Sequence, residues 1–461
     1  MAIENGKHID NGKPQSTVKV TGTTTVQTTK KPETATCPLA TFDLPYITFY
    51  YNQKILLYKT TPEQQFSDIV SKMKDGLAEA LGYFYPLAGR LGQDEEKALY
   101  VKCDGEEGFE GGVEVLEAVA EGVEVAELAA EGNEAEKNSI IQELVPYTGV
   151  MNLEGFNRPL LAIQFTKLKD GIAIGCAFNH AVLDGNSTWH FMSVWAELSR
   201  TPSSTPSDLP MHNRLAARST RVPLTLPASA AAHEAVDPNG PAKPLVPRLF
   251  HFKADTVSQL KSSMNTSLPP EAKPFSTFQT LSAHIWLAVS RARSLAPTDI
   301  TAFAVFGDCR SRVDPPMPSS YFGNLIQAIF TGTAAGLLLG SPPSFGAGLL
   351  QAAIDAHDSK AIIKRLDEYE AAPKLFHYSD AGMNCVAVGS SPRFKVYEVD
   401  FGFGRPERVR SGSNNKFDGM VYLYSGRDGD GSIDVELTLQ PEAMEKLEKD
   451  EEFLNPVFSA K

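Results

Sequence analysis

The sequence lacks most of the features that mark secreted, membrane-spanning and metal-binding proteins. Its five cysteines among 461 residues are odd in number and far apart, with neither the C-x-x-C spacing of zinc sites nor the regular spacing of a disulfide framework. The N-terminus has no apolar segment of the length that a secretory signal requires, and apolar runs such as residues 334–339 are too short to cross a bilayer. We expect a cytoplasmic protein that acts as a monomer, without a transmembrane segment or a bound metal ion.

Several common catalytic motifs are also missing. The chain has no G-x-S-x-G nucleophile elbow, no Walker loop and no H-E-x-x-H zinc helix. Asp400-Phe401-Gly402 matches the magnesium-binding motif of protein kinases, but no glycine-rich loop or His-Arg-Asp segment accompanies it, so we interpret this segment as a backbone turn. Residues 426–431 resemble a calcium loop without its first and twelfth ligands, and a hairpin turn is the better interpretation.

Positive charge is scarce as well. Lys and Arg total 43 against 56 Asp and Glu, which gives a formal net charge of -13. Nucleic acids and anionic membranes favour a basic protein surface, so we expect neither as the main partner. Hydrophobic residues make up 42% of the chain and charged residues 21%, the proportions of a folded globular protein.

Length and local composition predict two domains. Residues 1–15 are polar and are expected to form a disordered tail, followed by a first domain at residues 16–200. Pro, Ser, Ala and Thr dominate residues 201–247, which we interpret as a crossover linker. A second domain is expected at residues 248–461, where apolar patterns predict both strands and helices.

One histidine and one aspartate, four positions apart, stand where a predicted strand gives way to a helix. The apolar run 171–178 predicts a short buried strand, and Ser187 is expected to cap the helix that follows. His180 therefore lies on the turn between them, where a side chain that titrates near neutral pH can act as a general base. A purely structural hydrogen bond between His180 and Asp184 is the alternative interpretation of so short a pattern.

Two arginines follow another predicted strand. Arg310 and Arg312 come after the apolar run 302–306 and alternate along an extended segment, so both point to the same side. The pattern is compatible with an ion pair between one of them and Asp184, and equally with a solvated basic patch.

Five motifs occur together in one order along the chain. They are Tyr85-Pro86-Leu87-Ala88-Gly89-Arg90-Leu91, His180-x-x-x-Asp184-Gly185, Asp308-x-Arg310-x-Arg312, Tyr321-Phe322-Gly323-Asn324 and Asp400-Phe401-Gly402-Phe403-Gly404. Through these five motifs and their order, the chain resembles the plant BAHD acyltransferases. The resemblance implies an α/β fold with two chloramphenicol-acetyltransferase-like domains, each a mixed sheet with helices, joined by a long crossover loop. It also implies a channel between the domains that acyl-CoA and the acceptor enter from opposite faces.

The same resemblance implies roles for individual residues. His180 would be the general base, and Asp184 would orient its loop by pointing towards one of the two arginines. The structural supports would be Arg310, Arg312, Asp400, Gly402 and Gly404. The residues near acyl-CoA or the acceptor would be Ser390, Ser391, Asn179 and Gly185. No cofactor would stay bound, because acyl-CoA is a co-substrate that leaves as CoA, and the acceptor would be a hydroxylated small molecule or lipid.

Within the family, segments 41–46, 52–54, 178–192 and 399–404 are most similar to members that act in formation of the plant cuticle. This similarity implies transfer of a fatty or hydroxy-fatty acyl group to a hydroxyl group in cutin formation. Ser391 stands where hydroxycinnamoyl-transferring relatives often carry tryptophan, and Phe403 replaces another family tryptophan. The alternatives are a hydroxycinnamoyl-CoA O- or N-acyltransferase and a non-catalytic accessory protein for fatty-acid elongation.

Overall fold

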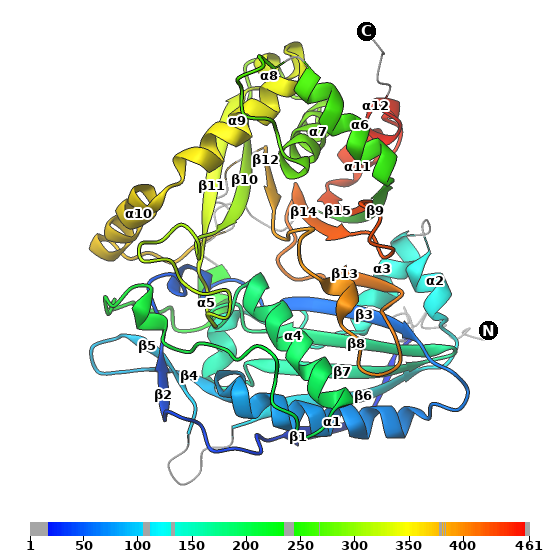
Figure 1. Cartoon of the computed structure of the whole chain (residues 1–461), viewed down its shortest axis with the longest axis vertical. Helices are drawn as coiled ribbons and strands as arrows, with labels where there is room; N and C mark the ends of the chain where they lie inside the picture. Colours follow the sequence, from blue (N-terminus) through cyan, green and yellow to red (C-terminus); the bar gives the residue numbers. More distant parts are fainter. Residues whose placement is uncertain are drawn as a thin grey trace, which may run out of the picture.

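Two six-stranded sheets organise the chain, one above the other in Figure 1. The computed structural model describes residues 17–104, 111–130, 134–234, 244–266, 268–377, 380, 382 and 384–456. The helices are α1 Phe66–Tyr83, α2 Val125–Ala129, α3 Glu134–Glu143, α4 Gly185–Arg200, α5 Ala230–Glu234, α6 Ala254–Thr266, α7 Thr277–Ala292, α8 Ala335–Gly340, α9 Pro343–Ala356, α10 Ser359–Ala371, α11 Pro441–Leu447 and α12 Glu451–Leu454. The prediction of mixed sheets combined with helices is confirmed.

The first sheet has the strand order β1-β6-β7-β8-β3-β13, with all neighbours antiparallel except the parallel pair β6 and β7. Its strands are β1 Lys19–Val26, β6 Val113–Ala120, β7 Leu161–Leu168, β8 Gly171–Phe178, β3 Asn52–Lys59 and β13 Arg408–Ser411. Helices α1 and α4 pack on one face, and α2 and α3 on the other, so β8 is buried along its whole length. A small separate sheet comprises β2 Thr36–Pro38, β5 Leu99–Lys102 and β4 Arg90–Gln93.

Local sequence explains why α1 and α4 pack so closely on this sheet. In α1 the buried residues Met73, Leu77 and Ala80 recur at helical spacing. Between them, Gly76 faces α4 so closely that a Cβ atom would lie 2.3 Å from the Ser199 hydroxyl. The expectation that Ser187 caps α4 is wrong. Asp184 is the N-cap residue, and its carboxylate accepts a hydrogen bond from the Ser187 backbone N–H at 2.9 Å.

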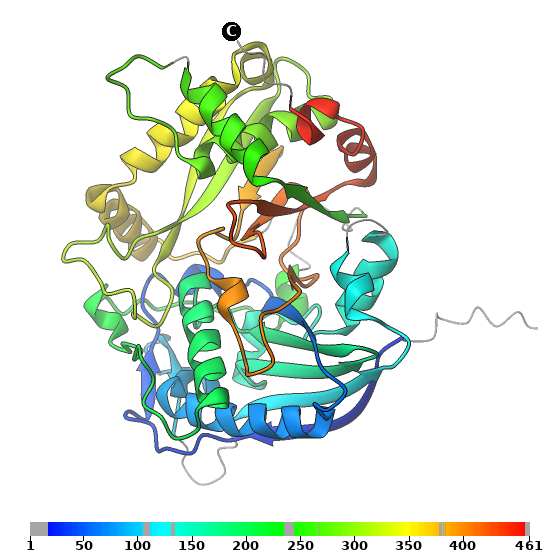
Figure 2. The same ribbon diagram turned by 45° about the vertical axis from the view of Figure 1, so that its right-hand side comes forward.

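The second sheet has the strand order β11-β10-β12-β14-β15-β9, with parallel pairing of β12 to both of its neighbours. Its strands are β11 Ile326–Ala334, β10 Ile300–Asp308, β12 Cys385–Val388, β14 Met420–Ser425, β15 Ile433–Leu439 and β9 Val246–Phe252. Helices such as α6, α7 and α9 cover one face, as both views of the ribbon show (Figures 1 and 2). The opposite face contributes Ala387 and Tyr422 to the core of the first half, so this face meets the first half.

The segment between the two halves contains little regular structure. Residues 201–234 hold only the 3-10 helix Arg214–Ala216 and α5, and β9 begins at Val246. We keep the division at residues 201–247 as a proposal, and the expected tail at residues 1–15 lies outside the described part of the chain. One strand crosses this division, because β13 comes late in the chain yet completes the first sheet.

Other sequence expectations can be compared with the described residues. All five cysteines are free and buried. Within the described ranges, no group of three or more His, Cys, Asp or Glu side chains is placed to hold a metal ion. None of the described helices is both long enough and apolar enough to span a membrane. Residues 426–431 form the turn of the antiparallel hairpin between β14 and β15, as predicted.

Candidate functional site

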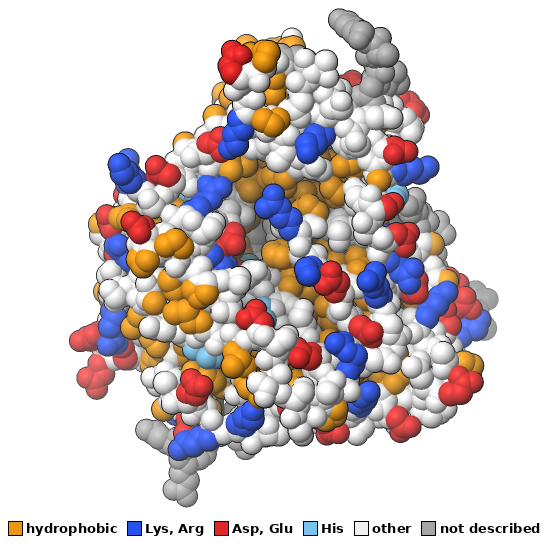
Figure 3. Space-filling model, viewed as in Figure 1, with side chains coloured by type: hydrophobic (Ala, Val, Ile, Leu, Met, Phe, Trp, Pro, Cys, Tyr) orange, Lys and Arg blue, Asp and Glu red, His pale blue; other side chains and the backbone are white. Residues whose placement is uncertain are grey.

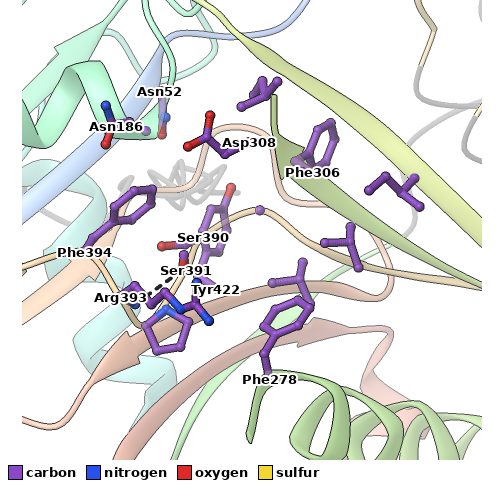
Figure 4. Close-up of a pocket in the computed structure, with 18 of the residues that line it drawn as sticks. Asn52, Asn186, Phe278, Phe306, Asp308, Ser390, Ser391, Arg393, Phe394 and Tyr422 are labelled. Carbon is purple, nitrogen blue, oxygen red and sulfur yellow. Dashed lines mark hydrogen bonds between the residues drawn. The ribbon is translucent and has the colours of Figure 1, made fainter. Parts of the chain in front are cut away.

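A cavity of about 560 Å³ lies where the inner face of the second sheet meets the first half. The molecular surface is hollowed at this level, and hydrophobic side chains gather in the hollow (Figure 3). Figure 4 shows Asn52, Asn186 and Asp308 on one side of the cavity and Ser390, Ser391 and Arg393 on the other. Both halves of the chain therefore contribute to one binding space.

His180 follows the end of β8 and lines this cavity. Its ring stacks on the ring of Tyr46 at a centroid distance of 4.7 Å and an interplanar angle of 6°, and the edge of Phe49 lies 6.2 Å away. Its backbone is held from two sides. The N–H donates to Asn152 Oδ1 at 2.9 Å, and the carbonyl accepts from Asn324 Nδ2 at 2.9 Å. The ring is thus fixed by packing and by its own backbone.

The electrostatic surroundings favour a neutral His180. Burial lowers the pKa of His180 below its ordinary value, and the charge of Lys54 acts in the same direction, while Asp184 and Asn324 oppose the shift. Nδ1 is buried and makes no hydrogen bond to any described residue, as is also true of Asn324 Oδ1. Because Nδ1 is shielded, only Nε2 is available to a substrate. A neutral imidazole that presents Nε2 to a cavity can accept a proton.

Asp184 does not point at the His180 ring but forms a buried ion pair with Arg310. Arg310 Nη1 donates to Asp184 Oδ2 at 2.8 Å, and Nη2 donates to Oδ1 at 3.1 Å. The same carboxylate accepts the backbone N–H groups of Ser187 at 2.9 Å and Leu325 at 3.0 Å. Burial alone would raise the pKa of Asp184, but the charge and hydrogen bonds of Arg310 outweigh it, so the pKa is lowered and the carboxylate stays ionised.

The second arginine has a different role. Arg312 Nη1 donates to the backbone carbonyls of Ile354 and His357, both at 2.7 Å. Arg312 therefore holds the end of α9, while Arg310 bridges the second half to the start of α4. The spacing of the two arginines left this choice open, and the structure assigns the pair with Asp184 to Arg310.

Four residues were expected near acyl-CoA or the acceptor, and three of them line the cavity: Gly185, Ser390 and Ser391. The Ser390 hydroxyl is buried and has no hydrogen-bond partner in the described chain. Ser391 Oγ accepts the backbone N–H of Arg393 at 3.2 Å (Figure 4). Gly185 faces Phe394 so closely that a Cβ atom would lie 2.8 Å from the Phe394 ring.

Asn179, the fourth of these residues, is not part of the cavity wall. Its side chain is fully buried, its Nδ2 donates to the Asn152 carbonyl at 2.8 Å, and its Oδ1 accepts the Ala181 backbone N–H at 3.2 Å. Asn152 in turn holds the backbone of His180. Asn179 therefore stabilises the loop that carries His180, and the structure offers no contact between its side chain and a ligand in the cavity.

The Asp400 segment forms a turn outside the cavity wall. Asp400 Oδ1 accepts the backbone N–H groups of Gly402 at 2.7 Å and Gly404 at 2.9 Å. Both glycines have positive φ angles, +103° and +100°, which side chains rarely adopt. Phe403 packs against the ring of Tyr58 at a centroid distance of 4.9 Å. These contacts support the backbone and place no group of this segment against a substrate.

Sequence reasoning did not single out Tyr46, Lys54 or Phe394 as site residues, although all three line the cavity. A local signal existed for Lys54, which is a charged residue directly before the apolar run 55–58 of β3. Tyr46 and Phe394 left no such signal, because a single aromatic residue usually packs in a core.

Comparison with known sequences gives consistent results over nearly the whole chain. Residues 16–454 match the model of the Transferase family. The chain is 54% identical over 429 residues to "BAHD acyltransferase DCR" of Arabidopsis thaliana, which covers 90% of this chain and 88% of that protein. It is 31% identical over 392 residues to the hydroxycinnamoyl-CoA:5-hydroxyanthranilate N-hydroxycinnamoyltransferase HHT4 of Avena sativa, covering 82% and 85% of the two chains.

Solved structures also resemble this chain in fold. Vinorine synthase matches 96% of this chain and 99% of its own, with a TM-score of 0.73 and 20% identity. TRI101 of F. graminearum, solved with coenzyme A and T-2 mycotoxin, matches 91% and 98% of the two chains, with a TM-score of 0.73 and 18% identity. At these identities the likeness shows a shared fold.

Proposed function

The chain belongs to the BAHD family of acyltransferases, and from that premise we propose that it transfers a fatty or hydroxy-fatty acyl group from CoA to a hydroxyl group in cutin formation. The observation that carries the catalytic part of this proposal is His180, a shielded, neutral imidazole on the wall of a cavity shared by both halves. We also propose that the protein is cytoplasmic and acts as a monomer.

In the proposed reaction His180 Nε2 accepts the proton of the acceptor hydroxyl while the oxygen attacks the thioester carbonyl carbon. The tetrahedral intermediate then collapses, the carbon–sulfur bond breaks, and the imidazolium returns the proton to the CoA thiolate. A positioned general base typically contributes a factor of about 100 to 10,000 to the rate. The lowered pKa of His180 supports this role, because it keeps the ring neutral and ready to accept a proton at pH 7.

The ion pair of Asp184 with Arg310 supports an orienting role. It ties the start of α4, which immediately follows the His180 loop, to the segment after β10 in the second half. Two hydrogen bonds in a bidentate pair fix the relative orientation of the two segments better than one. We propose that Asp184 and Arg310 hold the loop of His180 in place without taking part in proton transfer.

The acyl donor is proposed as a fatty acyl-CoA on two grounds. The first is the 54% identity to "BAHD acyltransferase DCR", together with the similarity of the segments named above to cuticle-forming members of the family. The second is the cavity wall, where Phe278, Val305 and Ile329 offer apolar surface to an alkyl chain. Each buried methylene contributes about 0.8 kcal/mol. The CoA complex of the structurally similar TRI101 supports CoA as the carrier.

A second candidate function is hydroxycinnamoyl transfer to a hydroxyl or amino group. The 31% identity to the hydroxycinnamoyltransferase of Avena sativa favours it. Ser391 argues against it, because hydroxycinnamoyl-transferring relatives often carry tryptophan at this position. The two functions differ in the donor and the acceptor, while the role of His180 is common to both.

A competition assay separates these candidates. The purified protein would receive medium- and long-chain acyl-CoAs together with p-coumaroyl-CoA, and a panel of hydroxy fatty acid, glycerol ester, shikimate and spermidine acceptors. Mass spectrometry would rank the products. We expect fatty acyl esters to dominate. Dominant p-coumaroyl esters or amides would refute the cutin assignment, whereas no acyl transfer by protein that still assists a fatty-acid elongase would establish the accessory role.

A further inference from the structure

Lys54 is a charged residue in the interior of the protein and in the wall of the candidate site. It lies in β3, between β8 and β13, and its side chain points to the same face of the sheet as those of Leu56 and Tyr58. Only 3% of the residue is exposed, and it lines the cavity together with His180. A lysine so placed cannot reach bulk solvent in the way that long side chains usually do.

The ammonium group has no fixed acceptor. It makes no hydrogen bond or ion pair with any described residue, and its nearest aromatic neighbour is Tyr422, whose ring centroid lies 5.2 Å from Nζ. Tyr422 also lines the cavity (Figure 4). Burial therefore lowers the pKa of Lys54 to about 8, which leaves it mostly protonated at pH 7.

The nearby carboxylate is already engaged by other groups. Glu436 accepts a hydrogen bond from Lys416 Nζ at 2.7 Å and one from the Ser411 backbone N–H at 3.0 Å. Arg410 Nε lies 3.9 Å from Glu436 Oε2. Its charge partly offsets the desolvation of Lys54, whereas Lys416 repels Lys54. A buried ammonium without a close anion costs stability. An anion that entered the cavity would remove this cost.

Lys54 and His180 both line the cavity. The positive charge of Lys54 is felt at the His180 ring, where it lowers the pKa of the imidazole. Such an effect weakens with distance, so an anion at Lys54 would lie near the group that reacts at His180.

We propose that Lys54 binds an anionic group of the acceptor, a carboxylate or a phosphate monoester that lies a few bonds from the hydroxyl group to be acylated. This inference rests on the proposed acyl transfer and narrows its acceptor to short hydroxy acids or hydroxyalkyl phosphates, including the glycerol phosphate type of lipid precursor. Binding would also strengthen the base, because an anion that neutralises Lys54 removes a charge that lowers the pKa of His180.

Matched acceptors and a matched variant test the proposal. The parent, Lys54→Met and Lys59→Met proteins would be compared with glycerol 3-phosphate against glycerol, and with a short hydroxy acid against its methyl ester. Lys59 lies in the same strand but is exposed and outside the cavity wall. We expect Lys54→Met to raise the KM for each anionic acceptor, relative to the KM for its neutral counterpart, roughly 10- to 100-fold, the effect of a lost charged hydrogen bond, while Lys59→Met leaves this ratio as in the parent. The preferred anion identifies carboxylate or phosphate as the ligand.

Two measurements keep the proposal testable without turnover. The affinity for glycerol 3-phosphate and for the hydroxy acid, measured by calorimetry, should be lower in Lys54→Met than in the parent. In the parent this affinity should fall as the pH rises through about 8, where Lys54 loses its charge. The charged groups that act on Lys54 are Glu436 and Lys416, and Tyr422 and His180 share the cavity wall with it, so the same titration of Lys54→Met gives the background. Lys54→Met should also melt at or above the temperature of the parent.

The proposal would be overturned by equal preference of the parent for neutral and anionic acceptors, by unchanged anion binding in Lys54→Met, or by a large loss of thermal stability in that variant. None of these results would contradict the proposed acyl transfer, because transfer to neutral acceptors by the parent protein tests that function separately. Conversely, a parent protein that binds the anions through Lys54 but transfers no acyl group would support the anion site and refute the proposed function.

Discussion

Asp184 and Arg310 lie 126 residues apart in the chain and are joined by a bidentate ion pair, with N–O distances of 2.8 and 3.1 Å. Neither charge is solvated, because the Asp184 side chain is 0% and the Arg310 side chain 4% exposed. Arg310 also donates to the backbone carbonyl of Tyr321 at 3.0 Å. One ion pair thus links the start of α4, the end of β10 and the Tyr321 to Asn324 segment behind the cavity.

Removing one member of this pair should destabilise the fold. Asp184→Ala leaves the guanidinium of Arg310 buried without its main partner, so we expect a loss of about 3 to 5 kcal/mol in the free energy of unfolding. Asp308→Ala is the matched control, since Asp308 also contacts Arg310 but its side chain is 57% exposed, and its loss should cost at most about 1 kcal/mol. Denaturant titrations of both variants measure the difference, and equal effects would contradict it.

Replacement of His180 should remove activity and leave the fold intact. We expect His180→Ala to lower kcat by a factor of about 100 to 10,000, the usual contribution of a general base. Nδ1 of the ring makes no hydrogen bond to any residue that the structure describes, and the backbone contacts of His180 with Asn152 and Asn324 do not depend on its side chain. Circular dichroism and CoA binding should therefore match the parent. Turnover close to the parental rate would show that another group accepts the proton.

His212 should make stability depend on pH. Burial lowers its pKa from the ordinary 6.5 to about 4, although its Nε2 donates to the Tyr83 carbonyl at 2.7 Å. Between pH 6.5 and 4 the unfolded chain binds a proton at this site that the folded chain does not. The free energy of unfolding should thus fall with decreasing pH by up to about 1.4 kcal/mol per pH unit.

The contribution of His212 can be isolated with His212→Gln, whose amide can still donate to the Tyr83 carbonyl. Denaturant titrations from pH 8 to 5 should give a shallower decline below pH 6.5 for the variant and parallel curves above it. An identical slope in both proteins would assign the pH dependence to other groups.

The Asp400 turn should affect stability and not substrate binding. Asp400→Ala removes two hydrogen bonds to backbone N–H groups and should cost about 1 to 3 kcal/mol. Phe403→Trp should be nearly neutral, because the half-buried ring at this position packs edge-on against Tyr58 and has room to change. KM values for donor and acceptor should be unchanged in both variants, as measured by initial rates. A large rise in either KM would place this segment in contact with substrate.

The sequence predicts the elements around His180 well, because the signals there are local. The apolar run 171–178 and the periodic residues of α4 lie close together in sequence, and the structure has both elements at these places. The helix cap was misassigned to Ser187 because Asp184 and Ser187 are both good caps, and only the backbone geometry decides between them.

The contacts that complete the site come from distant parts of the chain and leave no local pattern. Asn152 and Asn324 hold the backbone of His180 from either side, and although Asn324 belongs to one of the five motifs, nothing in the sequence indicates that either residue contacts His180. The choice of Arg310 over Arg312 depends on how β10 meets α4. The surroundings of Lys54 cannot be predicted from β3 alone, because its neighbours Tyr422 and Glu436 come from β14 and β15.

Strand β13 imposes an order on biosynthesis. The first sheet is closed only when Arg408–Ser411 pairs with β3, so closure must wait until residue 411 has left the ribosome. At roughly 5 to 20 residues per second, translation from β3 to β13 takes on the order of tens of seconds. During this time β3 is an edge strand with unpaired backbone groups, the kind of edge that promotes association between chains. The nascent first half therefore carries an open sheet edge until some of the last residues to be made cover it.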